Sequence, residues 1–252
     1  MENQSDNTGA YEKMARFYDK MMGDTKYPKW KILIAQIVNK YNIKTDICLD
    51  VACGTGNISR LLAELGFGVV GVDISPEMIQ IAKSKMPKER FVCSDIRNLA
   101  LSKEYTQGIS FAVSFYDSLN YLLTDEDMIR AFRSVYSSIS SGTIFLFDMN
   151  TIDHVKAAQQ YKPRILDEKE FYSVYSFSGE DRFWILDIDI FIKEGESYRL
   201  VREKHTERGY DEKDIAPLLK QVGFDLLEVI EERKTYEDGI ERLGRIYFVA
   251  KK

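Results

Sequence analysis

The chain has 252 residues, of which 44% are hydrophobic and 30% charged, and its formal net charge is −5. This size and composition suit one α/β domain with an insertion, and the mild acidity argues against a nucleic-acid partner. The polar first ten residues do not resemble a signal peptide, and no apolar run approaches the roughly 18–20 residues that a membrane span needs. Cys48, Cys53 and Cys93 lack the spacing of a disulfide framework or a zinc site. We therefore expect a cytoplasmic monomer or homodimer with reduced thiols, no metal and no membrane partner.

Two helices are predicted ahead of the first strand. Apolar residues recur at helical spacing over residues 12–22. Pro28 stands where a second helix would begin, and the same spacing continues to about Tyr41.

Short, almost wholly apolar runs then alternate with helical patterns. Strands that are buried on both faces of a parallel sheet have this composition. Capping residues mark helix starts at Ser75-Pro76 and at Thr124-Asp125. The predicted strands cover residues 47–51, 68–72, 91–93, 109–115 and 143–147. Strands and helices in this order predict right-handed βαβ units and an α/β fold with an open, doubly wound sheet.

The periodicity changes after about Lys162. Long runs rich in β-branched and aromatic residues follow, with no helix between them, at residues 171–177, 182–192 and 198–206. They predict an antiparallel meander inserted at residues 163–210, between core segments 1–162 and 211–252.

A two-residue turn at Glu194-Gly195 would set the pairing within the meander. The facing pairs would be Phe191 with Tyr198, Asp187 with Arg202, and Trp184 with His205. The even positions of the middle strand are uniformly apolar, so the main domain should cover that face.

The last part of the chain predicts one more helix and two strands. The helix is expected to start at Asp214 rather than Asp211, because Pro217 is tolerated only in the first turn. Strands at residues 224–230 and 246–249 would complete a mostly parallel sheet of seven strands.

The residues with chemical potential follow three strand ends. The glycine-rich turn Gly54-Thr55-Gly56 follows the first strand, Asp73 ends the second, and Asp95 ends the third. Ligands of open α/β sheets bind at these carboxyl ends, and glycine lets a ligand approach the backbone closely. An acid at the second strand end can accept hydrogen bonds from both hydroxyls of a ribose. An acid at the third can accept from an adenine amine.

A nicotinamide-dependent oxidoreductase would carry a similar turn. Its acid also follows about 20 residues later, so the spacing from Gly54 to Asp73 does not separate the two classes. The third small position of the dinucleotide pattern is Ser59 rather than glycine or alanine, and two helices precede the first strand. These departures disfavour the oxidoreductase without excluding it.

Taken together, three motifs resemble those of S-adenosylmethionine-dependent methyltransferases with the Rossmann-like (class I) fold. They are Asp50-Val51-Ala52-Cys53-Gly54-Thr55-Gly56, Val72-Asp73-Ile74-Ser75-Pro76-Glu77-Met78 and Ser94-Asp95-Ile96. The fourth strand departs from the family, which usually opens it with an aspartate where this chain has Gly108 or Ile109.

Two further segments extend the resemblance. Residues 11–19 are similar to the cap helix of bacterial small-molecule methyltransferases. Residues from about 165 to 210 resemble the antiparallel lid that members like glycine N-methyltransferase and amino-sugar N-methyltransferases insert after strand five. The resemblance implies a helical cap at residues 1–45, S-adenosyl-L-methionine as cofactor and S-adenosyl-L-homocysteine as product.

The resemblance also implies roles for single residues. The backbone at Ala52 and Gly54 would meet the methionine amine and carboxylate, and Asp73 would hold the ribose. The other cofactor residues would be Ile74 and Met78 against the adenine, Asp95 and Ile96 at its edge, Phe115 near the methionine arm, and Tyr18 and Trp30 closing from the cap.

Several residues are equally well or better explained as structural. Asp50 is expected to stabilise the glycine turn, and Met78 is as well explained by core packing. The remaining structural expectations are Cys53 filling the turn, Tyr11 and Tyr27 as core aromatics, Asp187 paired with Arg202, and His154 in an exposed loop.

The methyl acceptor would lie between the end of the fourth strand and the meander. Methyl transfer from a sulfonium is an in-line displacement, so the protein mainly aligns the reactants. A base is needed only where the acceptor must first lose a proton. The catalytic candidates are His205, Asp117 and Tyr116, although His205 is better explained as a structural partner at the hinge of the lid.

We therefore expect methyl transfer to a nitrogen or oxygen of a small molecule. Two alternatives stay open at this point: a nicotinamide-dependent oxidoreductase and a non-catalytic S-adenosylmethionine-binding module.

Overall fold

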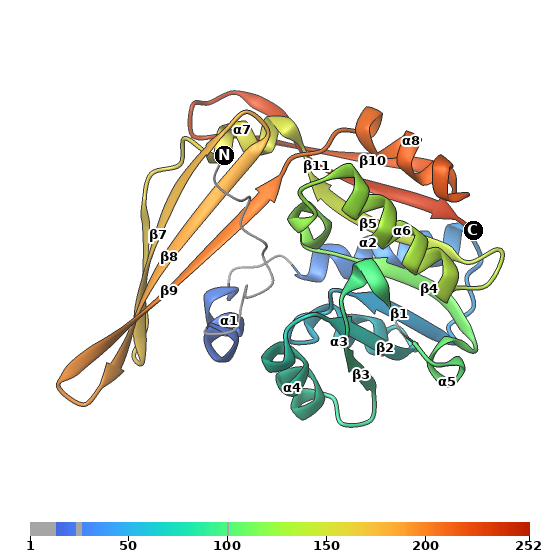
Figure 1. Ribbon diagram of the computed structural model, residues 1–252, viewed down its shortest axis with the longest axis horizontal. Helices are drawn as coiled ribbons and strands as arrows, with labels where there is room; N and C mark the ends of the chain where they lie inside the picture. Colours follow the sequence, from blue (N-terminus) through green and yellow to red (C-terminus); the bar gives the residue numbers. More distant parts are fainter. Residues whose placement is uncertain (1–13, 24–26, 100) are drawn as a thin grey trace.

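A computed structural model describes residues 14–23, 27–99 and 101–252, which form two β-sheets flanked by helices (Figure 1). The larger sheet has the strand order β10-β11-β5-β4-β1-β2-β3. Its strands are β1 (Ile47–Val51), β2 (Gly68–Asp73), β3 (Arg90–Cys93), β4 (Ile109–Ser114), β5 (Ile144–Asn150), β10 (Asp225–Thr235) and β11 (Glu241–Lys251). Strands β1 to β5 pair in parallel, and β11 runs antiparallel to both neighbours. The expected doubly wound, mostly parallel seven-stranded sheet is confirmed.

Helices cover both faces of this sheet. Leu49 and Val51 point into a core shared with α6 (Asp125–Ser138) and α8 (Glu212–Val222). Cys48, directly before Leu49, points into a second core shared with α2 (Tyr27–Lys40) and α3 (Asn57–Glu64). Because successive side chains of a strand face opposite sides, two covered faces explain the uninterrupted apolar runs.

Shorter helices connect the strands. They are α4 (Pro76–Lys85), η2 (Ile96–Asn98), α5 (Lys103–Thr106), η3 (Ser118–Tyr121) and α7 (Ile152–Ala158). The predicted caps of two helices are present, since Ser75 Oγ accepts from Met78 N–H and Thr124 Oγ1 from Asp127 N–H.

The second sheet is antiparallel, with the order β6-β7-β8-β9. Its strands are β6 (Arg164–Asp167), β7 (Phe171–Glu180), β8 (Phe183–Glu194) and β9 (Ser197–Arg208). The sequence predicted three of them and missed β6, which is a short, mostly exposed edge strand directly after Pro163.

The predicted register between β8 and β9 is wrong. Glu194 pairs with Ser197, so the turn consists of Gly195-Glu196 rather than Glu194-Gly195. Gly195 has a φ of +65°, and a two-residue hairpin turn needs a positive φ at its first central position. Each residue of β8 therefore faces a residue of β9 that lies two positions later in the chain than the predicted partner. The observed pairs are Phe191 with Leu200, Asp189 with Arg202, Asp187 with Lys204, Leu186 with His205 and Trp184 with Glu207.

The even face of β8 is covered by α1 (Ala15–Met21) and not by the main sheet. Met14 and Phe17 pack there with Ile188, Ile190 and Phe171 in an apolar cluster. Tyr11, directly before the predicted first helix, lies outside the described residues.

Two expectations about helix ends and loops are also wrong. α8 begins after Asp211 instead of Asp214, because Asp211 N–H donates to the Asp214 carboxylate (3.0 Å) and the two residues cap the helix together. Pro217 is accommodated inside this helix. His154 lies in α7 rather than in an exposed loop, with Nδ1 2.9 Å from the Tyr236 hydroxyl, and burial lowers the pKa of its imidazole well below the usual value.

The three cysteines are free thiols, with Cys48 and Cys53 buried and Cys93 exposed. Within the described ranges, no helix combines the length and apolarity needed to cross a membrane.

Candidate active site

The turn after β1 has an unusual backbone. Ala52, Gly54 and Gly56 have φ values of +58°, +54° and +82°. A Cβ atom added to Gly56 would lie 3.3 Å from the Ala82 Cβ, so this glycine allows close helix packing. A Cβ added to Gly54 would meet no atom within 4 Å. The backbone at Gly54 therefore borders open space, which is what close approach of a ligand requires.

Asp50, near the end of β1, stabilises the turn through a hydrogen bond to the start of α3. Its carboxylate accepts a hydrogen bond from Ser59 Oγ at 2.6 Å, and the side chain is buried. Burial raises the pKa of Asp50 to about 7, and the negative charge of Asp73 adds to the effect. This geometry fits the structural role expected for Asp50.

Asp73 lies at the edge of the same open space. Its two carboxylate oxygens accept from Gly54 N–H (2.8 Å) and Ser75 N–H (3.0 Å), and burial raises its pKa. Ile74, next in the chain, is 38% exposed, whereas Met78 is buried. An acid flanked by an exposed apolar residue beside a glycine turn suits a nucleoside. The residues present therefore fit an adenosine-containing cofactor.

Asp95 follows β3, one strand further. It is placed beside Asp73 because Ser94 N–H donates to the Asp73 carbonyl oxygen at 2.8 Å. Its carboxylate also forms an ion pair with Arg97 at 2.6 Å and accepts from Arg97 N–H, which starts η2. The pKa of Asp95 is lowered by these bonds, against the opposing effect of burial. Asp95 therefore has a structural function, and its contact with adenine, like that of half-buried Ile96, stays a prediction.

Helix α1 contacts the glycine turn through Asp19. The Asp19 carboxylate accepts from Thr55 Oγ1 (2.6 Å) and Asn57 Nδ2 (2.9 Å), and it pairs with Lys85 at 2.9 Å. Tyr18, the predicted cofactor residue on α1, is half-buried against the apolar cluster beneath the second sheet. The helix thus touches both the turn and the four-stranded sheet.

Trp30 of α2 forms an aromatic cluster with Phe115 and Tyr116, which directly follow β4 (Ile109–Ser114). The Trp30 ring lies 5.9 Å from Phe115 and 5.4 Å from Tyr116, centroid to centroid. Trp30 Nε1 donates to the Tyr247 hydroxyl at 3.3 Å. Trp30, Tyr116 and Tyr247 border a cavity of about 500 Å³. Its other lining residues are Met21, Met22, Lys29, Arg164, Ile165, Leu166, Tyr175, Phe177, Glu232 and Arg245.

The backbone leaving β4 is strained. Tyr116 and Asp117 are consecutive non-glycine residues with φ values of +65° and +51°. Such conformations persist where the surroundings impose them, and they are concentrated at functional sites. Here Asp117 N–H donates to the Asp148 carboxylate at 2.9 Å, which holds the strained turn against β5.

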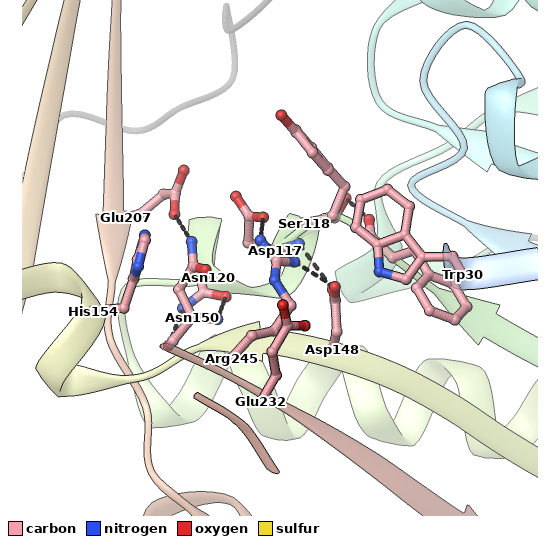
Figure 2. A network of polar contacts seen from close by, with 12 residues as sticks. Trp30, Asp117, Ser118, Asn120, Asp148, Asn150, His154, Glu207, Glu232 and Arg245 are labelled. Carbon is pink, nitrogen blue, oxygen red and sulfur yellow. Dashed lines mark hydrogen bonds and ion pairs between the residues drawn. The ribbon is translucent and has the colours of Figure 1, made fainter. Parts of the chain in front are cut away.

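A buried charged cluster lies at this turn (Figure 2). Arg245 of β11 forms ion pairs with Asp117, at 2.6 Å, and with Asp148. Glu207 of β9 accepts a hydrogen bond from Asn150 Nδ2 at 3.2 Å and faces the negative charge of Asp117. Burial raises the pKa of Glu207 well above its usual value and that of Asp148 to about 6.

Of this cluster, the sequence singled out only Asp117. Asp148 and Asn150 come directly after the predicted strand at residues 143–147, and Arg245 precedes the predicted closing strand. A usable signal did exist, since an acid and an arginine bordering apolar strands are costly to bury unless they pair.

His205 lies on β9, two residues before Glu207, and is buried. Its Nδ1 is 3.1 Å from the Tyr121 hydroxyl, and its Nε2 is 3.3 Å from Glu203 Oε2. Glu203 also accepts from Met14 N–H at 2.8 Å. His205 therefore links the four-stranded sheet to η3, while Asp117 and Tyr116 lie at the turn before η3.

Fold and site together define a class of protein. An open doubly wound sheet with a glycine turn, acids at the ends of β2 and β3, and a cavity beside β4 is the arrangement of a Rossmann-like enzyme that binds an adenosine-containing cofactor and a second reactant.

Comparison with known proteins identifies the family. A family described as methyltransferase domain matches residues 48–142. The chain is 32% identical over 250 residues to the putative methyltransferase YqeM of Bacillus subtilis (strain 168), covering 96% of this chain and 97% of that one. The chain therefore belongs to the S-adenosylmethionine-dependent methyltransferases, and its cofactor is S-adenosyl-L-methionine. The oxidoreductase and non-catalytic alternatives are set aside.

Solved structures agree with this assignment. An S-adenosylmethionine-dependent methyltransferase from Clostridium acetobutylicum ATCC 824 has a TM-score of 0.79 and 29% identity, over 96% of this chain and 98% of that chain. DesVI from Streptomyces venezuelae shares the fold, with a TM-score of 0.72 and 18% identity over 93% of this chain and 96% of that chain.

Proposed function

We propose that this methyltransferase methylates a nitrogen or an oxygen of a small molecule that binds in the cavity beside β4 and β11. The volume of about 500 Å³ carries the proposal, because cavities that enclose small ligands have about 300–1,000 Å³. Aromatic side chains form much of its wall, namely Trp30, Tyr116, Tyr175, Phe177 and Tyr247. A flat or apolar acceptor body would pack well there.

The cofactor belongs at the glycine turn in this proposal. S-adenosyl-L-methionine supplies a methyl group on a positively charged sulfur. Ala52, Gly54 and Asp73 bind its methionine and ribose portions, and the open space beside Gly54 supports this. The proposed remainder of the cofactor site is Ile74, Met78, Asp95, Ile96, Phe115, Tyr18 and Trp30.

Residues 163–210 serve as a lid that selects the acceptor, and the rest of the chain serves as the core. Three consecutive residues of β6 and two of β7 line the cavity. The glycine turn, Asp73 and Asp95 all lie in the main sheet. This separation supports a division between acceptor binding and cofactor binding.

The three catalytic candidates take different roles. Tyr116 borders the cavity, so it positions the acceptor. Asp117 lies behind it, paired with Arg245. His205 contacts Tyr121 and Glu203, so it positions η3 relative to the lid.

Two aromatic residues of the lid provide a matched test. Phe177 lines the cavity, whereas Phe191 stacks on Tyr172 at 4.4 Å, with its side chain outside the cavity lining. A screen of small amines, phenols and carboxylates, followed by formation of S-adenosylhomocysteine, identifies an acceptor. Phe177→Ala should then raise the acceptor KM by about tenfold or more, equivalent to about 1.4 kcal/mol. Phe191→Ala should leave it unchanged.

Calorimetry with S-adenosylhomocysteine completes the experiment. Both variants should bind it as the unaltered protein does, because neither side chain lies at the glycine turn. Equal KM values for the two variants would place the acceptor elsewhere.

A further inference from the structure

The charged cluster beside the cavity holds more acidic than basic groups. Asp117, Asp148 and Glu207 surround the single guanidinium of Arg245, and the three carboxyl groups are 8%, 0% and 4% exposed. Lys234 also faces Asp117, and burial lowers the pKa of its ammonium to about 8. Burying an uncompensated charge is costly, so the cluster holds at least one proton. Burial raises the pKa of Glu207 well above its usual value, which assigns that proton to Glu207.

A second observation points to a missing hydrogen-bond donor. Asn150 is 2% exposed, and its amide nitrogen donates to Glu207. Its amide oxygen finds no hydrogen-bond donor among the described residues. A buried acceptor without a donor is costly, and a bound group that carries N–H donors would satisfy it.

The two acids come from different parts of the molecule. Glu207 reaches from the lid strand β9, whereas Asp117 stands on the strained turn after β4 (Figure 2). Arg245 contacts Asp117 and also lines the cavity. The pair thus lies where the lid and the main sheet meet, beside an arginine that borders the cavity.

We propose that Asp117 and Glu207, together with Asn150, bind the ammonium group of an amine acceptor and take its proton. This inference rests on the proposed function and narrows the acceptor from a nitrogen or oxygen nucleophile to an amine. With the proton on Glu207, the two aspartates and Arg245 together carry one net negative charge. A docked ammonium neutralises it and offers Asn150 its donor.

The reaction balances without another reactant. One N–H bond of the ammonium breaks and its proton moves to the pair, which leaves a lone pair on nitrogen. That lone pair forms the new N–C bond as the S–C bond of the donor breaks, and sulfur keeps the bonding electrons. The methylated ammonium leaves, and the pair loses its extra proton to water.

The test compares amines with alcohols of the same shape. Calorimetry on the protein saturated with S-adenosylhomocysteine measures binding of benzylamine against benzyl alcohol, and of butylamine against butanol. We expect at least one amine to bind about tenfold more tightly than its alcohol. Asp117→Asn removes the negative charge that attracts the ammonium and leaves the hydrogen bond from Asn150 to Glu207 in place, so it should abolish this preference.

Asp189→Asn is the matched control, because Asp189 is a lid carboxylate that pairs with Arg202 at 3.1 Å near the surface. It should keep the amine preference. Equal binding of amines and alcohols, no amine binding at millimolar concentrations, or an unchanged preference in Asp117→Asn would each overturn the inference. The comparison in the unaltered protein decides the question even where Asp117→Asn fails to fold. Failure to bind S-adenosylhomocysteine would instead contradict the proposed function.

Discussion

At the scale of single residues, Asp73 has a structural role in the fold and a binding role in the proposed site. It anchors the glycine turn through Gly54 N–H and the start of α4 through Ser75 N–H. In the proposed site it also accepts hydrogen bonds from the ribose.

Asp73→Ala should weaken binding of S-adenosylhomocysteine by about tenfold or more, because a hydrogen bond to a charged group contributes about 1.5–3 kcal/mol. The melting temperature should fall as well, since two backbone donors lose their acceptor. Asp73→Asn keeps one carbonyl acceptor and should cause a smaller loss. A dissociation constant that calorimetry finds unchanged in Asp73→Ala would contradict the ribose role.

Asp50 makes stability depend on pH. Its pKa in the folded protein is about 7, above its ordinary value of 3.8, so the folded state binds the proton more tightly than the unfolded state does. The free energy of unfolding should therefore fall as pH rises through that window. Asp50→Asn removes the effect and should gain about 2–3 kcal/mol relative to the unaltered protein between pH 5 and pH 8.

Chemical denaturation of both proteins at the two pH values measures this difference. The intrinsic cost of the asparagine cancels when the two pH values are compared. Parallel changes in the two proteins would show that another group determines the pH dependence.

At the scale of elements, α1 connects two parts of the molecule. Phe17 packs into the apolar cluster of the lid, and Asp19 holds the glycine turn. The first contact is apolar and the second polar, so substitutions can separate them.

Ile188→Asp should detach α1 from the lid, because it places an unpaired charge in a side chain that is 2% exposed. Acceptor turnover should collapse. Binding of S-adenosylhomocysteine should change by less than about tenfold, or about 1.4 kcal/mol, because Asp19 still anchors α1 at the turn. The control is Asp187→Ser, on the opposite, exposed side of the same strand.

Loss of cofactor binding in a variant that circular dichroism shows to be folded would contradict this division. It would mean that α1 transmits displacement of the lid to the glycine turn.

The sequence predicted the elements better than their pairing. Buried strands and capped helices depend on neighbouring residues, and the predicted strands β1 to β5 are present. The β8–β9 register depends on the position of one glycine in the turn. A turn at Glu194-Gly195 and a turn at Gly195-Glu196 both place oppositely charged residues of the two strands opposite each other. Only the positive φ of Gly195 decides between them.

At the scale of the whole molecule, the two sheets differ in how they are covered. Helices pack on both faces of the seven-stranded sheet (Figure 1). In the four-stranded sheet, the first four residues of β9 are all exposed, and buried residues then alternate with exposed or half-buried ones. Local unfolding should therefore need less free energy in the lid.

Amide hydrogen exchange tests this difference. Exchange should be faster in β7 to β9 than in β1, β4 and β5. Adding S-adenosylhomocysteine should slow exchange mainly in residues 47–73, which include the glycine turn, and change β8 little. Equal protection of both regions by the ligand would show that the lid belongs to the cofactor site.

The proposed cofactor residues could be predicted from the sequence, whereas the charged cluster could not. The proposed cofactor residues from Ala52 to Ile96 follow successive strands, so a local pattern could indicate them. The charged cluster unites Asp117, Asp148, Glu207 and Arg245 from four separate segments. Sequence patterns without a topology do not show which of these segments meet.

The position of β11 bears on the order in which the chain folds. This strand inserts between β5 and β10, and it carries the guanidinium that pairs with Asp148 and Asp117, which lie 97 and 128 residues earlier. Loop closure over such distances costs entropy, and distant pairings slow folding. Until β11 inserts, both aspartates lack their counter-charge and stay hydrated or protonated. We therefore expect the β1–β4 region to become ordered first, and insertion of β11 to be the late step that seals the acceptor side.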